Sequence, residues 1–326
     1  MAELTVNTEA VLRNYRRFAA GGQVIPVLKD NACGLGVVKM LQLLRQEGVN
    51  LFACSTPEEA LRLSGMGVDI LLLSCVHEEA ILRELAKRKV ILSVESLPQA
   101  RVISGLGLHT RVHLIVDTGF GRFGFLPEET EEMRAVFDLQ GLTVCGIFSH
   151  FRSPASAPQQ FAAFRRVLDA LSDCDLGLRH IAATSTALNP AYRLDAVRIG
   201  TGLTGRYDGL EPSAQLTARV CSVRHLPRGS RIGYSSVRLR RDTDVAIVDV
   251  GTADGAFLRR CCGPRALLRL IRKKVSIGGW EVPVLGSPGL THTAIDVTGV
   301  PCTVGDRVSI NQTPVLISPA VPRRYT

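Results

Sequence analysis

Short apolar runs recur along the first two-thirds of the chain, and each is followed by a stretch with helical spacing or by a loop leading into one. After the first run, for example, Val38, Leu41 and Leu44 are spaced as on one face of a helix. A helix capped by Asn7 or Thr8 is expected before the first strand. Eight such units predict a parallel (β/α)8 barrel of the TIM type, an α/β fold, rather than an open sheet. The expected strands are Val24–Leu28, Leu51–Ser55, Ile70–Cys75, Val90–Val94, Arg111–Asp117, Val144–His150, His180–Thr184 and Ala196–Ile199.

The pattern changes near Leu216, where short strand-like pieces separated by turns begin. Turn signals such as Pro227-Arg228-Gly229 and Gly278-Gly279 lie between them. We therefore expect a barrel domain over residues 1–212 and a smaller C-terminal all-β domain over residues 213–326. The expected strands of the second domain are Leu216–Val223, Arg231–Tyr234, Val245–Val250, Val282–Leu285, Ala294–Val297 and Arg307–Ile310.

The net charge of +9 is divided unevenly between these domains. Residues 213–326 hold 17 Lys and Arg against 7 Asp and Glu, a net charge of +10, which leaves −1 for residues 1–212. The change in charge at the same place supports the domain boundary. The basic residues of the second domain are not interleaved with aromatic ones, so a solvated face or a subunit interface is expected rather than a nucleic-acid surface. They include Arg259, Arg260, Arg265, Arg269, Arg272, Lys273 and Lys274.

Several classes of protein are excluded by composition. No window approaches the 18 or so apolar residues of a membrane helix, and no signal peptide is visible at the start of the sequence. The nine cysteines are irregularly spaced and lie mostly in apolar stretches, which is typical of reduced cysteines in a cytoplasmic protein. The pair Cys261-Cys262 lacks further ligands at zinc spacing, so no metal site is expected.

Candidate catalytic residues are sought where barrel strands end, because active sites of such barrels lie at the carboxyl ends of the strands. Lys29 ends the first apolar strand, where partial burial suits a lysine to imine chemistry. The tight glycine-rich loop after the fifth strand holds Arg122, and His150 ends the sixth strand. A snorkelling surface lysine and a hydrogen-bonded core histidine are the alternative interpretations of Lys29 and His150.

The last two strands carry the features of a phosphate site. Thr184-Ser185 ends the seventh strand, and Gly200 and Thr201 follow the eighth, where such barrels often bind phosphate. Arg198 lies within the eighth strand, and a buried cation there needs a partner, either a ligand or His150. A lysine, a phosphate site and an arginine together indicate a phosphorylated aldehyde, for which pyridoxal 5'-phosphate is the obvious candidate.

Seven segments in order make the sequence similar to the alanine racemase family of fold-type III pyridoxal-phosphate enzymes, over essentially the whole chain. These segments are Val27–Gly36, similar to V-K-A-N-A-Y-G-H-G; His113–Gly124, similar to H-x-K-x-D-T-G-M-G-R-x-G; Ser149–Phe151; Thr184-Ser185; Val197–Gly205; Ile232–Ser235 with Val250–Gly255; and Ile317–Arg323.

The resemblance implies a role for each matching residue. Lys29 would form an imine with the cofactor and act as a base on one face of the substrate Cα. Tyr234, from the partner subunit, would act on the other face. Two bases on opposite faces would give racemisation of an amino acid. Arg198 would hydrogen-bond the pyridine nitrogen of the cofactor, and His150 would orient Arg198.

Further contacts with cofactor and substrate are implied in the same way. Arg122 would approach the phenolic oxygen of the cofactor or the substrate carboxylate. Ser185 and the amides of Gly200 and Thr201 would hold the phosphate. Leu290 would lie in the substrate-entry region. A homodimer with shared active sites is expected, acting on a small amino acid in the cytoplasm, with no nucleic-acid or membrane partner.

The sequence departs from the family pattern at several positions. Cys33 stands where the family has a phosphate-binding tyrosine, and Gln312 or a neighbour stands where it has another. Ile115 replaces a lysine that positions the arginine corresponding to Arg122. Leu290-Thr291 replaces Met-Asp, and Thr252 replaces a tyrosine of the entry channel. Both bases are retained while contacts to phosphate and substrate are fewer.

Three functions are therefore compared. The leading interpretation is alanine racemase, with a racemase for another amino acid such as serine as a variant of it. A pyridoxal-phosphate-binding homeostasis or regulatory protein would fit the missing phosphate contacts, but the β-domain and Tyr234 argue against it. A decarboxylase or a metal-dependent aldolase would need motifs that Cys261-Cys262-Gly263, His292 and Cys302 do not provide.

Overall fold

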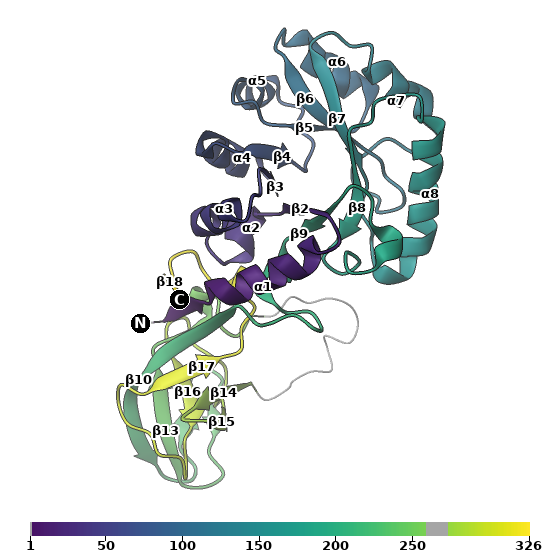
Figure 1. The fold of residues 1–326 in the computed structure, drawn as a ribbon. Coiled ribbons are helices and arrows are strands. Elements are labelled where there is room, and N and C mark those ends of the chain that lie inside the picture. The colour runs from purple at the N-terminus through teal and green to yellow at the C-terminus, as the bar shows by residue number, and fades with distance from the viewer. Residues whose placement is uncertain (1, 259–272) are drawn as a thin grey trace. The chain divides into compact units, whose positions relative to one another are not determined.

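The structure is a computed structural model that describes residues 2–258 and 273–326. These residues form two compact units (Figure 1). The barrel unit comprises residues 10–32 and 37–211, and the β unit comprises residues 2–9, 33–36, 212–258 and 273–326. The pair Cys261-Cys262 and five of the seven basic residues named above, Arg259 to Arg272, lie outside the described residues.

Eight parallel strands close into a barrel, as the sequence pattern predicts (Figure 1). Six of them pair in the order β2-β9-β8-β7-β6-β5, and β3 pairs with β4. Isolated parallel bridges from Val27 to Ala53 and from Leu71 to Ile91 join the two groups into one ring. The strands are β2 (Gln23–Pro26), β3 (Leu51–Cys54), β4 (Asp69–Leu72), β5 (Leu92–Val94), β6 (Thr110–Ile115), β7 (Leu142–Phe148), β8 (Leu178–Ala183) and β9 (Ala196–Ile199).

The helices that follow these strands lie around the outside of the ring (Figure 1). In α3 the buried face holds Val37, Met40, Leu41 and Leu44, whereas Val38, assigned to that face from its spacing, is 38% exposed. Among the described residues, no helix combines the length and apolar character that a membrane span requires. The helices are α1 (Thr8–Ala19), α3 (Val37–Gln46), α4 (Pro57–Leu63), α5 (Glu79–Lys87), α6 (Leu97–Gly105), α7 (Thr130–Val136) and α8 (Ala157–Ala170).

Short turns of helix complete the connections. The segment α2 (Lys29–Cys33) directly follows the first barrel strand and is described with the site below. The remaining short helices are of the 3-10 type: η1 (Ser64–Met66), η2 (Pro154–Ser156), η3 (Pro190–Tyr192), η4 (Thr201–Thr204), η5 (Thr252–Asp254) and η7 (Pro314–Leu316).

The β unit is built on a sheet that includes both ends of the chain. Its path of paired strands runs β15-β14-β17-β10-β1-β18, and β13 joins β10 to β16. The strands are β1 (Glu3–Val6), β10 (Ala214–Leu226), β13 (Thr243–Val248), β14 (Lys274–Ile277), β15 (Trp280–Pro283), β16 (Thr293–Asp296), β17 (Arg307–Ile310) and β18 (Arg323–Tyr325).

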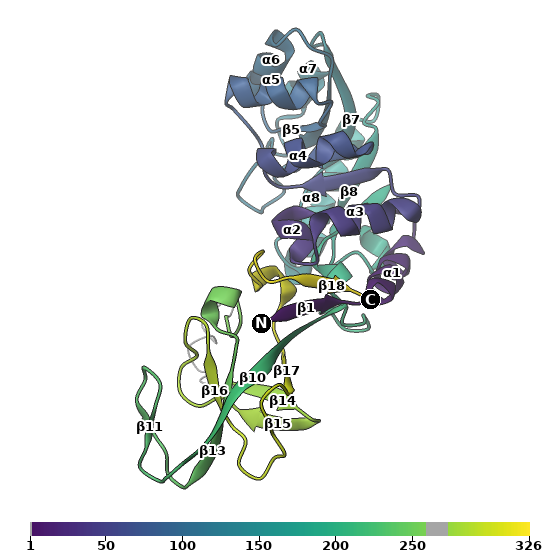
Figure 2. The ribbon, with the colours of Figure 1, turned by 90° about the vertical axis from the view of Figure 1, so that its left-hand side faces the viewer.

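Several features of this unit differ from the sequence expectation, and strands β14 and β18 were not expected at all. Strand β1 pairs with β10 and β18, so residues 2–9 belong to the β unit rather than to the barrel. A four-residue strand gives too short an alternation to be recognised alone. The strand expected at Arg231–Tyr234 is only β11 (Arg231–Ile232), which forms a small hairpin with β12 (Val237–Arg238) (Figure 2). Tyr234 lies in the turn of this hairpin.

The segment 33–36, which follows Lys29 closely in sequence, belongs to the β unit and is enclosed by it. A Cβ at Gly34 would lie 2.0 Å from the carbonyl oxygen of Pro314, and one at Gly36 would lie 1.9 Å from the Tyr325 hydroxyl. Arg323 Nε donates to the Gly34 oxygen at 3.2 Å, and the Tyr325 hydroxyl donates to the Leu35 oxygen at 3.1 Å. The close approach that these glycines suggest is therefore an approach to protein.

We expect Gly34→Ala to lower the free energy of unfolding by more than the cost of an alanine at positive φ. The added methyl group would also overlap the Pro314 backbone. Gly48→Ala is a matched control, since φ is +85° at Gly48 and +89° at Gly34, yet no atom lies within 4 Å of a Cβ at Gly48. Urea unfolding should show a loss of about 1 kcal/mol for the control and at least twice that for Gly34→Ala. Equal losses would contradict the close approach.

Candidate active site

Lys29 lies at the carboxyl end of the barrel strands, directly after the last backbone group tied into the barrel. The Val27 amide donates to the Ile199 carbonyl at 2.8 Å, and the Leu28 amide donates to the Ala53 carbonyl at 2.7 Å. The next residue, Lys29, is half-buried and begins α2. Hydrogen bonds to the strands on either side of β2 thus fix the backbone directly before Lys29.

The four residues after Lys29 form a left-handed turn. Residues 30–33 all have φ between 53° and 56°, although none of them is glycine. Left-handed helix costs an L-residue roughly 1–2 kcal/mol, so the surroundings must hold this turn. The Asp30 amide donates to Glu59 Oε1 at 2.7 Å, and Asn31 Oδ1 accepts from the Val37 amide at 2.9 Å. Strain at this position marks the lysine turn as a functional feature.

Arg198 is the buried cation of the eighth barrel strand. Its side chain is only 3% exposed, and its Nη2 donates to the carbonyls of Ser149 at 2.6 Å and Ile181 at 3.2 Å. Nη2 also lies 3.1 Å from His150 Nδ1, and Nη1 contacts His180 Nδ1. Burial lowers the pKa of Arg198, and so does the charge of Arg122. An arginine nevertheless keeps its proton in proteins, and the carbonyl acceptors compensate its burial.

One nitrogen of this guanidinium remains open. Among the described residues, Nε of Arg198 has no hydrogen-bond partner. In the same part of the chain, no buried side-chain nitrogen or oxygen lacks a partner. Nε therefore retains an N–H without a partner among the described residues, and Arg198 lies on β9, which pairs with β2, the strand before Lys29. Such a donor suits a ring nitrogen that accepts a hydrogen bond, so the donor set fits pyridoxal phosphate.

Two further histidines extend the Arg198 cluster into the barrel. His180 Nε2 lies 3.1 Å from His113 Nδ1, and the two side chains are 0% and 1% exposed. Burial is the main cause that lowers the pKa of His113 to about 3 and the pKa of His180 well below its usual value. Both rings are therefore neutral. Because Arg198 only donates, His180 Nδ1 must accept, which places the proton of His180 on Nε2 and makes His113 Nδ1 an acceptor.

A glycine on the neighbouring strand makes room for this chain of rings. Gly146 is the β7 partner of His113 in the sheet register. A Cβ at Gly146 would lie 2.3 to 2.5 Å from the His113 ring atoms. On the next strand pair, the His180 ring stacks on Phe148 with centroids 5.0 Å apart. The barrel interior is thus shaped around the two histidines.

His150 lies beside Arg198, as expected for a residue that orients it. Burial is the first cause that lowers its pKa to about 3, and the charges of Arg198, Arg122 and Lys29 add to this. His150 is therefore neutral, with Nδ1 accepting from Arg198 Nη2. The charges that act on His150 are those of Arg198, Arg122 and Lys29, whose roles in the site remain predictions.

The Arg122 loop is organised by one carboxylate. Asp117 accepts hydrogen bonds from the backbone amides of residues 119, 120, 121 and 122 at 2.7 to 3.1 Å. Burial favours the neutral acid, but these donors outweigh it and lower the pKa of Asp117. The Arg122 guanidinium lies 4.5 Å from the Phe120 ring centroid and 5.3 Å from that of Phe123. The Arg122 guanidinium thus lies against two aromatic rings. Ile115, which replaces the family's positioning lysine, is buried in β6.

The hydroxyl groups expected at a phosphate site lie after β8 and β9. Ser185 is exposed, Thr201 begins η4, and Gly200 precedes it. The neighbouring Thr184 Oγ1 accepts from the Gly202 amide at 3.2 Å, which ties the turn after β8 to η4. The phosphate role of Ser185, Gly200 and Thr201 remains a prediction.

The other two predicted residues belong to the β unit. Tyr234 is 96% exposed and Leu290 is 70% exposed. The Leu290 carbonyl accepts from the Ala253 amide at 3.0 Å, which fixes the backbone of that loop. Side chains so fully exposed are available to another molecule, although their part in the site stays a prediction.

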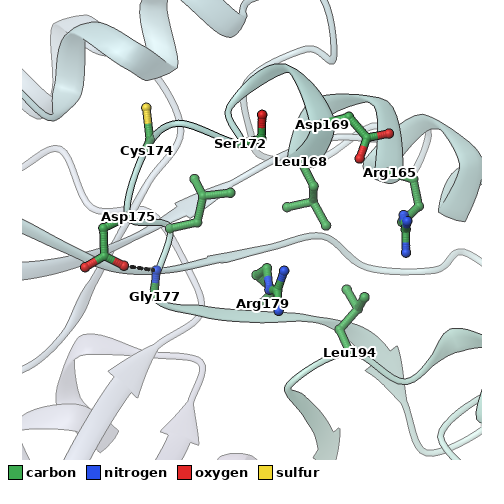
Figure 3. Close-up of a pocket in the computed structure, with 10 residues that line it drawn as sticks. Arg165, Leu168, Asp169, Ser172, Cys174, Asp175, Gly177, Arg179 and Leu194 are labelled. Atoms are coloured by element: carbon green, nitrogen blue, oxygen red, sulfur yellow. Dashed lines mark hydrogen bonds between the residues drawn. The ribbon is translucent and has the colours of Figure 1, made fainter.

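A separate pocket lies beside Arg179, near the start of β8, and Leu194, just before β9 (Figure 3). Its volume is about 380 Å³, and its lining comes from the end of α8, the turn after it and the start of β8. Asp175 Oδ1 accepts from the Gly177 amide at 3.2 Å within it, and Arg179 is paired with Asp195. None of the predicted site residues lines this pocket.

Sequence reasoning did not identify the roles of His113, His180, Asp117 and Gln160. A polar residue within an apolar barrel strand, opposite a glycine on the next strand, is the signal that could have found His113. Asp117 precedes a glycine-rich loop, where a carboxylate commonly accepts backbone amides. For Gln160 the helical spacing alone shows only that it shares the buried face of α8.

A (β/α)8 barrel with a half-buried lysine, an arginine with an open donor and a separate β unit defines the class of fold-type III barrel enzymes. Within that class the sequence matches the family described as "Alanine racemase, N-terminal domain" over residues 6–208 and "Alanine racemase, C-terminal domain" over residues 213–318. The chain belongs to the alanine racemase family.

Individual relatives agree with this assignment. The chain is 31% identical to the alanine racemase of Methanococcus maripaludis over 317 residues, which cover 88% of this chain and 82% of the relative. The alanine racemase of Clostridium difficile 630 has the same fold, with a TM-score of 0.89, 23% identity and coverage of 100% of this chain and 95% of that one. The alanine racemase of Bartonella henselae, solved with covalently bound pyridoxal phosphate, gives a TM-score of 0.86, 24% identity and coverage of 100% and 99%.

We expect His113, His150 and His180 to remain neutral, with the proton on Nε2, in the folded protein at pH 5. His225, whose pKa is raised by its bond to Asp244, should be charged at that pH. Because the three buried pKa values lie below that of an unfolded histidine, unfolding takes up protons, and stability should fall as the pH drops below about 6.5. Nitrogen-15 spectra of histidine-labelled protein test both tautomer and charge. An imidazolium signal from any of the three would contradict the cluster.

Proposed function

We propose that this chain is a pyridoxal-phosphate-dependent alanine racemase, an enzyme that interconverts L- and D-alanine. The family assignment supports the reaction and the cofactor, and the names of the relatives support alanine as the substrate. The observation that carries the proposal in this chain is the buried guanidinium of Arg198, whose Nε has no partner among the described residues and which lies on the strand next to the one that leads to Lys29.

Each residue at this end has a part in the proposed reaction. The cofactor, when bound, supplies an electron-accepting ring that stabilises the charge left on Cα by loss of its proton. Lys29 would hold the cofactor covalently and move a proton on one face of Cα. Tyr234 would move a proton on the opposite face. Arg198 would donate from Nε to the ring nitrogen, and because a guanidinium keeps its proton, that nitrogen stays unprotonated.

Substrate and phosphate contacts complete the proposal. No carboxylate of the described residues forms an ion pair with Arg122, so its guanidinium is available to the substrate carboxylate. Ser185 and the amides of Gly200 and Thr201 would bind the phosphate, and Leu290 would line the substrate entrance. We further propose a cytoplasmic homodimer in which Tyr234 serves the partner's site. The free thiols of the described cysteines support the cytoplasm as the compartment.

Lys29→Ala should abolish racemisation of alanine and the visible absorption of the lysine-bound cofactor, because no other described lysine ends a barrel strand. Lys39→Ala, on the exposed face of α3, should leave both unchanged. A substrate panel that includes serine would show whether alanine is preferred. Purified protein with bound cofactor but no racemisation of any amino acid, and no deuterium exchange at alanine Cα, would favour a cofactor-carrying protein instead.

Tyr234→Phe should lower kcat by about 10²- to 10⁴-fold, because one of the two proton-transfer groups is lost. If sites are shared across a dimer, mixing this variant with Lys29→Ala should restore activity, since one site of each heterodimer keeps both groups. Statistical exchange of subunits predicts about a quarter of the wild-type specific activity. Absence of rescue after verified subunit exchange would show that Tyr234 acts within its own chain or not at all.

A further inference from the structure

Gln160 is a buried glutamine on the inner face of α8, with only 3% of its surface exposed. A side-chain amide has two N–H donors and an oxygen with two acceptor positions, and burial makes each of them costly to leave unpaired. In this chain all four positions are used. The partners of Gln160 therefore show what it is placed to do.

The two donors of Gln160 reach two different catalytic loops. Its Nε2 donates to the carbonyl oxygen of His150 at 3.1 Å and, over a longer contact of 3.4 Å, to Thr118 Oγ1. Thr118 lies in the loop after β6, between Asp117 and Arg122, and His150 follows β7. One amide group thus joins the loop that carries Arg122 to the segment that carries His150.

The side-chain oxygen of Gln160 anchors the amide to the segment that leads into α8. Oε1 accepts from the Arg152 amide at 2.8 Å and from the Ser156 hydroxyl at 2.9 Å. Ser156 lies just before α8, so this half of the amide is anchored to the helix start. The orientation of the amide, with its nitrogen toward the loops, follows from the Arg152 amide, which can only donate and therefore requires the Gln160 oxygen opposite it.

Two other contacts connect the same loops and lead on to Arg198. The hydroxyls of Thr118 and Ser149 lie 2.8 Å apart, and the Ser149 carbonyl accepts from Arg198 Nη2. The Phe120 ring, which lies against the Arg122 guanidinium, has its centroid 5.3 Å from that of His150. A shift of the Gln160 amide would therefore reach both Arg122 and the Arg198 cluster.

We propose that Gln160 is a positioning residue that fixes Arg122 and His150 relative to each other by holding the loops after β6 and β7 with its two N–H donors. The inference rests on the proposed racemase function for its catalytic meaning. The linkage itself is a property of the protein with or without substrate.

Gln160→Glu is the sharpest test, because a carboxylate keeps both acceptor contacts, to Arg152 and Ser156, and loses both donors to the catalytic loops. Gln159→Glu adds the same charge at the preceding, exposed position of α8 and is the matched control. At neutral pH, hydrogen exchange should accelerate in residues 118–124 and 149–153 of Gln160→Glu and remain as in wild type in the control. Unchanged exchange in both variants would overturn the proposal.

Activity gives a second measurement with a distinctive dependence on pH. Displacing groups by even 1 Å commonly costs an enzyme about 10²-fold, and we expect a loss of that order in kcat/KM for Gln160→Glu. A buried carboxyl beside a carbonyl has a raised pKa, and protonation returns one donor to it. The ratio of variant to wild-type kcat/KM should therefore rise as the pH is lowered. A constant ratio would indicate a purely structural role and overturn the proposal.

Thr118→Val provides the test if Gln160→Glu does not fold. It removes the hydroxyl that both Gln160 Nε2 and the Ser149 hydroxyl contact, so exchange should accelerate in residues 118–124. Ser149→Ala removes only the second of these contacts and is the control, in which the acceleration should be smaller. Exchange unchanged in residues 118–124 would contradict the linkage. Wild-type protein without racemase activity would contradict the proposed function alone, because the exchange measurements need no substrate.

Discussion

The buried guanidinium of Arg198 is the constraint on which the candidate site depends. A cation inside a barrel must be surrounded by acceptors, and this one takes the carbonyls of Ser149, Ile181 and His180 and the ring nitrogens of two histidines. These acceptors lie on β8 and directly after β7, so the arginine also holds the carboxyl ends of neighbouring strands together. Its charge, in turn, requires those histidines to be neutral.

The same requirement explains the polarity of the barrel interior. Neutral histidines accept from Arg198 on one nitrogen and keep a proton on the other, so the direction of hydrogen bonding runs from the arginine toward His113. Gly146 opposite His113 gives the last ring its space. Around this fixed cluster, strained and clamped loops present Lys29 and Arg122. The Arg198 cluster inside the barrel therefore forms the fixed part of the site, and the loops at the ends of the strands carry Lys29 and Arg122.

Much of this arrangement could be predicted from the sequence. The eight strand and helix units, and the positions of Lys29, Arg122, His150 and Arg198 at strand ends, follow from apolar periodicity and the rule for parallel barrels. The linking residues could not be predicted in this way, because Gln160 and His180 act through contacts between segments distant in sequence. Strand β1 was missed for a related reason, since its partners β10 and β18 begin only at Ala214 and Arg323.

The composition of the β unit has a consequence for the order in which the protein is made. The segment 33–36, next to the lysine turn, is fastened by Arg323 and Tyr325, which lie 289 and 290 residues further along the chain than their partners Gly34 and Leu35. During synthesis the segment is therefore made long before the residues that anchor it. A chain that lacked β18 would carry every reactive group and yet leave the lysine turn without its downstream support, so the site is complete only once β18 has paired with β1 in the β unit.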